Sequence, residues 1–297
     1  MWKEIVMKKI VITGGSGFVG SRFKKMWEHK YEIIALSSKD LNVSDQAAVD
    51  AFMDRERPDY VLHMAGLANQ QYCIEHPEQA HAVNVDGTLF MAKACKRVGA
   101  KMVFTSTEQL FNGDSIEPGP YTEESIPCPN TVYGENKYEA EQKLPEILKE
   151  LWIVRFTWIF GMPEKDCASG SNILMDTIKS ILLNQPIKTS EYEFRGMTDV
   201  DEICTNLEKL FNFPYGTYNF GSTNPDGRYE VVRFIMEQLG LSEERIGELL
   251  IADNSKYNKE HTRELRLDNT KAKEAGLTFR DTKDAIANCL KRFAIIK

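Results

Sequence analysis

The feature that most constrains the fold is an alternation of short apolar runs with segments of helical spacing over the first half of the chain. Apolar runs without polar alternation are typical of parallel strands that are buried on both faces. The helices between them provide the crossover connections of a parallel sheet. The sequence therefore predicts an α/β fold, a Rossmann-type doubly wound parallel sheet. The predicted strands are Lys9 to Thr13, Glu32 to Leu36, Tyr60 to Ala65, Lys101 to Thr105 and Trp152 to Phe156, and the predicted helices are Phe18 to Glu28, Asp45 to Arg57, Pro77 to Val98 and Tyr133 to Glu150.

The rhythm changes after Gly161, where helices and very short strands follow without regular alternation. We therefore expect residues 1–161 to form a dinucleotide-binding Rossmann domain and residues 162–297 to form a smaller C-terminal substrate-binding lobe, interleaved with late elements of the sheet. Pro145 lies inside the Tyr133 to Glu150 segment and is expected to kink or split that helix. The later elements predicted are helices over 172–183, 200–211, 229–239 and 282–293, short strands near Ile187 and Phe194, and the run 216–221.

The composition excludes several classes of partner. The formal net charge of −7 gives no global positive field for nucleic acid or an anionic membrane. No run of 18 or more apolar residues is present, and Met1 to Lys9 has no apolar core of a signal peptide, so we expect a cytoplasmic protein. The six cysteines have neither metal-ligand nor redox spacing, and the histidines form no ligand cluster, so no metal site is predicted.

A glycine-rich turn, Thr13 to Gly20, connects the first predicted strand to the first helix. The three-residue spacing of its glycines, in this strand-to-helix context, is typical of dinucleotide sites. Backbone amides at the helix N-terminus can bind a pyrophosphate even in a protein of negative net charge. A tight turn without a ligand is the structural alternative. The predicted cofactor-binding residues of this turn are Gly14, Ser16, Gly17, Phe18, Val19 and Gly20.

The end of the second predicted strand indicates which nicotinamide cofactor binds. An NAD site normally presents an acidic residue here, but this chain has Ser37, Ser38 and Lys39. Two hydroxyls and an ammonium suit the 2′-phosphate of NADP, and Arg22 in the first helix would add a second cation. The sequence thus favours NADP(H), while NAD(H) stays open because Asp40 is close. The alternative for Arg22 and Lys39 is solvated surface charge.

Two groups of residues have the character of an acid or base site. Tyr133 and Lys137 stand four residues apart and share one face of the predicted helix, so the ammonium can favour the ionised phenol. Tyr133 is then a candidate acid or base near neutral pH. Ser106 and Thr107 follow the fourth strand, where hydroxyls can hydrogen-bond a substrate carbonyl, although such a pair by itself is commonly a turn or helix cap.

With these elements in this order, the chain resembles the extended short-chain dehydrogenase/reductase family and, within it, the dTDP-4-dehydrorhamnose reductases. The resemblance extends over nearly the whole length and is specific for the superfamily rather than for one substrate. The stretches that carry it are Ile12 to Gly20, Asp59 to Gly66, Ala82 to Thr88, Ser106 to Gly113, Pro129 to Lys137, Arg155 to Gly161 and Arg266 to Lys271.

The resemblance implies a role for several positions. Tyr133 would be the proton donor, and Lys137 would bind the nicotinamide ribose and lower the pKa of the phenol. The third hydroxyl would come from Thr107 in preference to Ser106. Trp158 would pack at the sugar end of the site, or else be a core residue at a strand end. Further positions implied are Asn84, which supports the cofactor, Ala65 and Gly66 in the cofactor cleft, and Glu108 near the substrate.

The chain departs from the reductases where the sugar would lie. They have Ser-Thr-Asp-Tyr where this chain has Ser106 to Gln109, and an aromatic residue where it has Leu67 to Asn69. These departures leave the identity of the substrate sugar undetermined, but they do not affect the expected fold. His63, at the end of the third strand, is expected to be structural.

The function expected is NADPH-dependent reduction of a nucleotide-linked 4-keto-6-deoxysugar. A nucleotide-sugar epimerase or dehydratase is one alternative, although this chain is short for that group. A non-catalytic NADP-binding regulatory subunit is the other, because the regulatory subunit of methionine adenosyltransferase resembles the same reductases. The partner expected is a small nucleotide sugar, and a homodimer is a further expectation.

Overall fold

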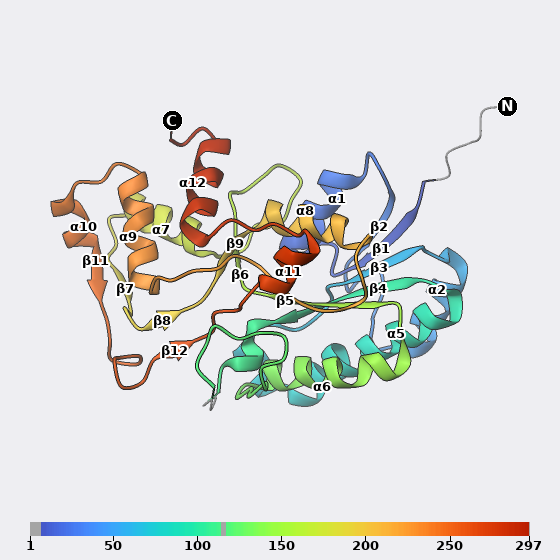
Figure 1. The fold of residues 1–297 in the computed structure, drawn as a ribbon. Coiled ribbons are helices and arrows are strands. Elements are labelled where there is room, and N and C mark those ends of the chain that lie inside the picture. The colour runs from blue at the N-terminus through green and yellow to red at the C-terminus, as the bar shows by residue number, and fades with distance from the viewer. Residues whose placement is uncertain (1–6, 114–116, 297) are drawn as a thin grey trace.

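A six-stranded parallel sheet forms the centre of the computed structural model, which describes residues 7–113 and 117–296 (Figure 1). β2 lies on one side of β1 and β3 on the other, so the strand order reverses at β1. In open parallel sheets this point leaves a crevice at the carboxyl ends of the strands. The predicted parallel sheet is confirmed. The spatial order is β10 (Gly216–Phe220), β5 (Leu151–Phe156), β4 (Lys101–Thr107), β3 (Tyr60–His63), β1 (Lys9–Thr13) and β2 (Glu32–Leu36).

Helices cover both faces of the sheet, as a doubly wound fold requires (Figure 1). Alternate strand residues separate two cores: Ile10 and Ile12 belong to one, and Val11 to the other. The first core packs against α1 (Phe18–Trp27), α8 (Val200–Leu210) and α11 (Thr270–Ala275), and the second against α2 (Gln46–Glu56), α5 (Gly87–Val98) and α6 (Val132–Ile147).

The long helix predicted over Pro77 to Val98 consists of three consecutive helical segments. α4 (Pro77–His81) continues through a π-helical turn, η1 (Ala82–Asp86), into α5, which ends at Gly99 in the left-handed conformation with φ 79°. A π turn inside a helix commonly marks a functional position, and this one contains Asn84. The predicted split of α6 at Pro145 is wrong, because the helix extends to Ile147 and the proline lies only in its last turn.

A third hydrophobic core lies in the C-terminal lobe, which we define as the elements around Phe160, Ile173, Val232 and Ile286. Three α-helices of the described residues lie outside the predictions: α3, α10 and α11 are six, seven and six residues long, too short for a clear helical period. The remaining elements are α3 (Gln70–Glu75), η2 (Glu108–Phe111), β6 (Trp158–Phe160), α7 (Ile173–Leu182), β7 (Ile187–Thr189), β8 (Glu193–Phe194), β9 (Met197–Asp199), α9 (Arg228–Gln238), α10 (Glu243–Leu249), β11 (Leu250–Ala252), β12 (Arg263–Glu264) and α12 (Thr282–Arg292).

The long loop predicted between Thr107 and Asn130, of which residues 114–116 lie outside the described ranges, is packed against the end of the chain. The Tyr121 amide donates to the Arg266 carbonyl at 2.8 Å, and the Asp268 amide donates to the Tyr121 carbonyl at 2.8 Å. The Tyr121 ring stacks on Phe111, with 4.3 Å between ring centroids. These contacts hold the loop beside β12 instead of leaving it free in solvent.

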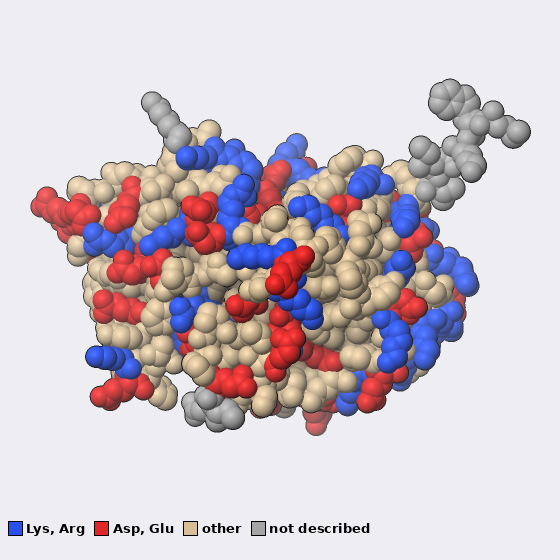
Figure 2. Space-filling model, in the orientation of Figure 1, with Lys and Arg blue, Asp and Glu red and all other residues tan. Residues whose placement is uncertain are grey.

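Acidic and basic side chains are interspersed over the face of the molecule that Figure 2 shows. The negative net charge is therefore not gathered into one patch on that face. Within residues 7–113 and 117–296, no helix has both the length and the apolar character needed to cross a bilayer.

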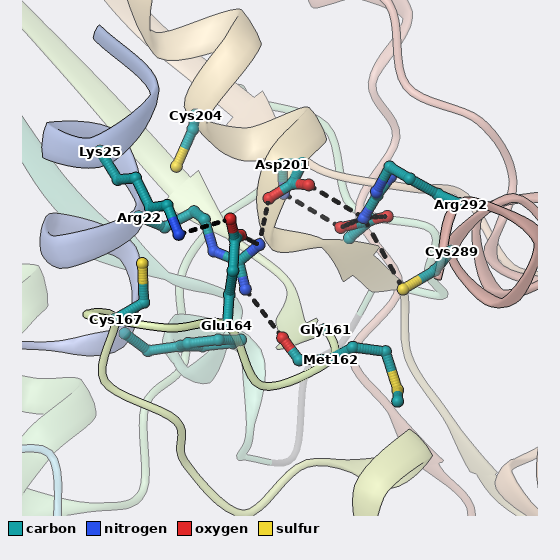
Figure 3. Close-up of polar contacts among 12 residues, drawn as sticks. Arg22, Lys25, Gly161, Met162, Glu164, Cys167, Asp201, Cys204, Cys289 and Arg292 are labelled. Carbon is teal, nitrogen blue, oxygen red and sulfur yellow. Dashed lines mark hydrogen bonds and ion pairs between the residues drawn. The ribbon is translucent and has the colours of Figure 1, made fainter. Parts of the chain in front are cut away.

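A buried ion network connects α1 to the segment after β6 and to α8 (Figure 3). Arg22 is only 1% exposed, and its guanidinium binds Glu164, Asp201 at 3.0 Å and the Met162 carbonyl at 2.8 Å. Arg292 of α12 continues the network and contacts Asp201 at 3.0 Å. The network therefore joins the sheet to the C-terminal lobe.

The location of Arg22 overturns both sequence-based interpretations of this residue. Its guanidinium is neither free for a 2′-phosphate nor solvated, because Glu164, Asp201 and the Met162 carbonyl bind it in the interior. It therefore cannot support the NADP preference.

Arg22→Met is predicted to lower the free energy of unfolding by about 3 kcal/mol, because it leaves carboxylates without their buried partner. Urea unfolding measures this loss. Lys24→Met, an exposed position on the same helix, is the control and should change stability little. Equal effects of the two changes would contradict a connecting role for Arg22.

Candidate functional site

A cleft of about 580 Å³ opens at the carboxyl ends of β1, β2 and β3, where the strand order reverses. It contains seven of the predicted cofactor residues. Those that line it are Gly14, Ser16, Gly17, Ser37, Ser38, Ala65 and Gly66, with Thr13, Leu36, Leu41, Asn42, Val43, Met64, Leu67, Gln79 and Val83 completing the wall. Phe18, Val19 and Gly20 continue from this turn into α1.

The turn itself has room only for glycine at critical positions. Gly14 has φ +68°, and a Cβ there would lie 2.8 Å from the Met64 backbone. A Cβ on Gly20 would lie 2.7 Å from Gly15. No side chain caps the N-terminus of α1 at Gly17, so its amides stay available to an anion. The close backbone contacts at Gly14 and Gly20 hold the turn together, and the free amides of α1 fit a dinucleotide pyrophosphate.

The end of β2 carries both a carboxylate and an ammonium. Asp40 accepts hydrogen bonds from the Ser37 amide at 2.8 Å and the Ser37 hydroxyl at 2.7 Å, and these bonds lower the pKa of Asp40. Lys39 is exposed and does not line the cleft. Because both charges are close to the predicted ribose position, the geometry alone does not choose between NADP and NAD.

Thr107, Tyr133 and Lys137 come together at the ends of β4 and α6. Thr131 caps α6 by accepting a hydrogen bond from the Gly134 amide at 3.1 Å, which sets Tyr133 in the first turn. The phenol is hydrogen-bonded to Thr107. Lys137 lies one turn further along and donates to the Thr105 carbonyl at 2.7 Å. The shared helix face expected for Tyr133 and Lys137 is thus present, and the two side chains enclose the end of β4.

Burial, rather than Lys137, dominates the acidity of Tyr133. It raises the pKa of Tyr133 to about 12, with a smaller increase from Cys73, while the hydrogen bond with Thr107 opposes it. The expected lowering by Lys137 is not among these influences, although its ammonium nitrogen lies 5.9 Å from the centre of the Tyr133 ring. Burial also lowers the pKa of Lys137 to about 8, against the influence of Glu141. A phenol that stays protonated at neutral pH suits a proton donor.

Two other predicted residues have distinct surroundings. Ser106 is 3% exposed, and its hydroxyl has no hydrogen-bond partner in the described part of the chain. Asn84 is buried and holds the loop after β3, accepting from the Leu67 amide at 2.7 Å and donating to the Leu67 carbonyl at 3.1 Å. This fixes the Gly66 segment, where an added Cβ would lie 3.6 Å from the Lys137 nitrogen. Asn84 therefore affects the cofactor cleft indirectly, by fixing the backbone that forms its wall at Gly66.

His63 is a structural residue, as expected. Its ring nitrogens contact the hydroxyl of Thr13 at 2.8 Å and that of Thr88 at 3.0 Å, which connects β1, β3 and α5. It is fully buried, and burial lowers its pKa to about 3. The neutral ring is held in place by two hydroxyls and has no access to a substrate.

The predicted sugar end contains charges that no local pattern indicated. Half-buried Trp158 has Arg195 4.7 Å and Arg228 4.9 Å from its ring centroid. Glu108 is 1% exposed and forms an ion pair with Arg195. Cys73, another unforeseen neighbour, influences the Tyr133 phenol. Arg195, Arg228 and Cys73 could not be found from the sequence because their partners in the site are distant along the chain.

A second cavity of about 860 Å³ lies between the loop after η2 and the segment before β12. It begins next to the first turn of α6, since Thr131 is part of its wall, and it is rich in polar groups. Its lining includes Gln70, Phe111, Asn112, Glu117, Tyr121, Asn130, Thr131, Lys256, Tyr257, Glu260, His261, Arg263, Glu264 and Arg266. Trp158 does not line this cavity, so the expected sugar contact must be tested separately.

The parallel sheet, the glycine turn at its reversal point and the Thr107, Tyr133 and Lys137 group define an extended short-chain dehydrogenase/reductase. The chain belongs to the RmlD substrate binding domain family, which matches residues 7–295.

Three similar proteins illustrate the range of this family. The spore coat polysaccharide biosynthesis protein SpsK of Bacillus subtilis is 28% identical over 79% of this chain and 81% of its own. Methionine adenosyltransferase 2 subunit beta of Xenopus laevis is 26% identical over 77% of this chain and 74% of its own. The crystal structure of dTDP-4-dehydrorhamnose reductase from Bacillus anthracis in complex with NADP shares the fold, with a TM-score of 0.84 and 21% identity over 98% of this chain and 100% of that one.

The stability of the protein is predicted to fall as pH drops below 6.5, partly through His63. Its folded pKa of about 3 lies below the ordinary value of 6.5, so the unfolded chain binds this proton first. Each pH unit between these values costs about 1.4 kcal/mol. Unfolding of His63→Asn, measured from pH 7 to pH 4, should show a shallower decline than the native chain. Exposed His29→Asn is the control, and parallel curves for native and His63→Asn proteins would overturn the assignment.

Proposed function

We propose that the protein is an NADPH-preferring reductase that converts the carbonyl of a nucleotide-linked 4-keto-6-deoxysugar to a hydroxyl. The observation that carries this proposal is a protonated, half-buried Tyr133 hydrogen-bonded to Thr107, beside a cleft that fits a dinucleotide. A bound nicotinamide supplies the hydride. Reduction of a carbonyl also needs a proton at the nascent alkoxide, and Tyr133 is the group able to donate it.

Each residue of the site has its own role in the proposed reaction. Tyr133 gives its proton to the sugar oxygen, and Thr107 orients that oxygen and the phenol together. Lys137 would hold the nicotinamide ribose from beneath the Gly66 wall, and its positive charge would stabilise the phenolate left on Tyr133. Trp158 would pack on the sugar, with the polar cavity beside Thr131 receiving the nucleotide.

Similar proteins support the substrate class. SpsK carries polysaccharide biosynthesis in its name, and the Bacillus anthracis enzyme is a dTDP-4-dehydrorhamnose reductase in complex with NADP. A second candidate function is a cofactor-binding regulatory subunit without turnover. The likeness to methionine adenosyltransferase 2 subunit beta favours it.

The deciding experiment is a panel of thymidine-, uridine-, guanosine- and cytidine-linked 4-ketosugars assayed with NADPH. The reductase proposal expects one of them to consume NADPH with 1:1 stoichiometry. Tight NADPH binding without oxidation across the panel, together with a stable heteromer on gel filtration, would establish the regulatory alternative instead.

Tyr133→Phe is predicted to lower kcat by about 100-fold or more while leaving the Kd for NADPH nearly unchanged, because only the ionisable oxygen is removed. Steady-state kinetics and fluorescence titration measure the two effects. Thr131→Ser, which keeps the cap of α6, serves as a neighbouring control. A variant retaining more than about a tenth of native kcat would show that another group donates the proton.

Lys39→Asp is predicted to weaken NADPH several-fold more than NADH, because it sets a carboxylate against the 2′-phosphate. Fluorescence titrations with both cofactors measure the difference. Lys93→Asp, an exposed change of the same charge on α5, controls for net charge. If both cofactors weaken equally, or neither does, Lys39 is surface charge and the NADP preference loses its main support.

A further inference from the structure

The short helix η2 follows Thr107 directly, and its first turn is bound to that residue. The Thr107 hydroxyl accepts a hydrogen bond from the Gln109 amide at 3.2 Å. Any shift of η2 would therefore move the hydroxyl that contacts Tyr133. The contacts that hold η2 in place therefore also affect the position of the Thr107 hydroxyl.

Both ends of η2 are held by arginines of the later half of the chain. At its start, buried Glu108 pairs with Arg195. At its C-cap, the side-chain amide oxygen of Asn112 (Oδ1) accepts a hydrogen bond from Arg263 Nε at 2.9 Å. Arg195 lies between β8 and β9, and Arg263 lies in β12. Each contact therefore joins η2 to a segment that is distant in the sequence.

The two arginines are coupled through one buried carboxylate. Glu193, 4% exposed, lies 2.9 Å from Arg263 and 3.7 Å from Arg195, and Arg228 adds a contact at 3.2 Å. Arg195 is also fixed by the Trp158 ring and through its own carbonyl, which accepts from Asn224 at 2.8 Å. The ion pairs therefore form one connected network, in contrast to independent ion pairs on the surface.

We infer that these contacts, Glu108 with Arg195 and Asn112 with Arg263, joined by Glu193, form a clamp that positions Thr107 for proton transfer. We call them the η2 clamp. As a statement about catalysis it rests on the proposed function. Arg195 and Arg263 are positioning residues, because they act on Thr107 through η2.

The clamp also connects the acid site to the substrate region. Arg195 packs on Trp158, and Arg263 lines the polar cavity next to Thr131. Buried Arg195 Nε and one Glu108 oxygen have no hydrogen-bond partner in the described part of the chain.

The test separates positioning from simple structural support. Arg195→Met and Glu108→Gln should each lower kcat about 10- to 100-fold with little change in the Kd for NADPH, because the misplaced group is a hydroxyl and not the cofactor cleft. Arg195→Met also leaves buried Glu108 without its partner, and Glu108→Gln leaves Arg195 with only its longer contact to Glu193, so each change lowers Tm. The double variant Glu108→Gln with Arg195→Met removes both charges. It should recover Tm but not kcat.

Hydrogen exchange provides a readout that does not depend on turnover. Amides of residues 108–112 should exchange faster in Arg195→Met and in Arg263→Met than in the native protein. Arg233→Met, which removes a surface arginine paired with Glu237 on α9, is the control and should leave the exchange of this segment unchanged.

The outcomes are distinguishable. If the native protein turns over no ketosugar, the proposed function fails while exchange still decides the clamp. Native exchange rates at 108–112 in both arginine variants, or a double variant that recovers kcat together with Tm, would overturn the clamp.

Discussion

The site depends on the reversal of strand order at β1, which leaves one crevice at the carboxyl edge of the sheet. At that point Gly14 passes so close to the Met64 backbone that a methyl group would clash. The buried hydroxyl and imidazole contacts of Thr13, His63 and Thr88 hold the two strands and α5 together behind it. Without this packing, the free amides of α1 and the Gly66 segment would not face the same cleft.

Burial at the end of β4 shifts both titratable groups toward their neutral forms. It raises the pKa of Tyr133 to about 12, which widens the pH range in which the phenol is protonated, and it lowers the pKa of Lys137 to about 8. A protonated phenol is the form that a reductase needs at the start of the reaction. The proximity of an ammonium, which the Tyr-x-x-x-Lys spacing suggested, does not outweigh desolvation in this structure.

The sequence predicted what depends on local patterns. Apolar runs, glycine spacing and the four-residue separation of Tyr133 and Lys137 each depend on neighbours within one or two turns, so the sheet and the cleft could be located. Arg22 was misinterpreted because its carboxylate partner Glu164 is 142 residues away. Glu108 and Arg195 are separated by 87 residues, and the signal for such a pair lies only in the folded structure. The short helices α3, α10 and α11 had too few turns to show a period.

The central claim is that hydride passes from a bound nicotinamide to a sugar carbonyl beside Tyr133 and stays there. It is tested most directly with NADPH deuterated at the transferring C4 position and the nucleotide-linked 4-ketosugar that the panel selects. The account predicts one deuterium on C4 of the product sugar and one oxidised cofactor per sugar reduced. Deuterium that remains on the cofactor, or that returns to it while the sugar is merely epimerised, would contradict the account.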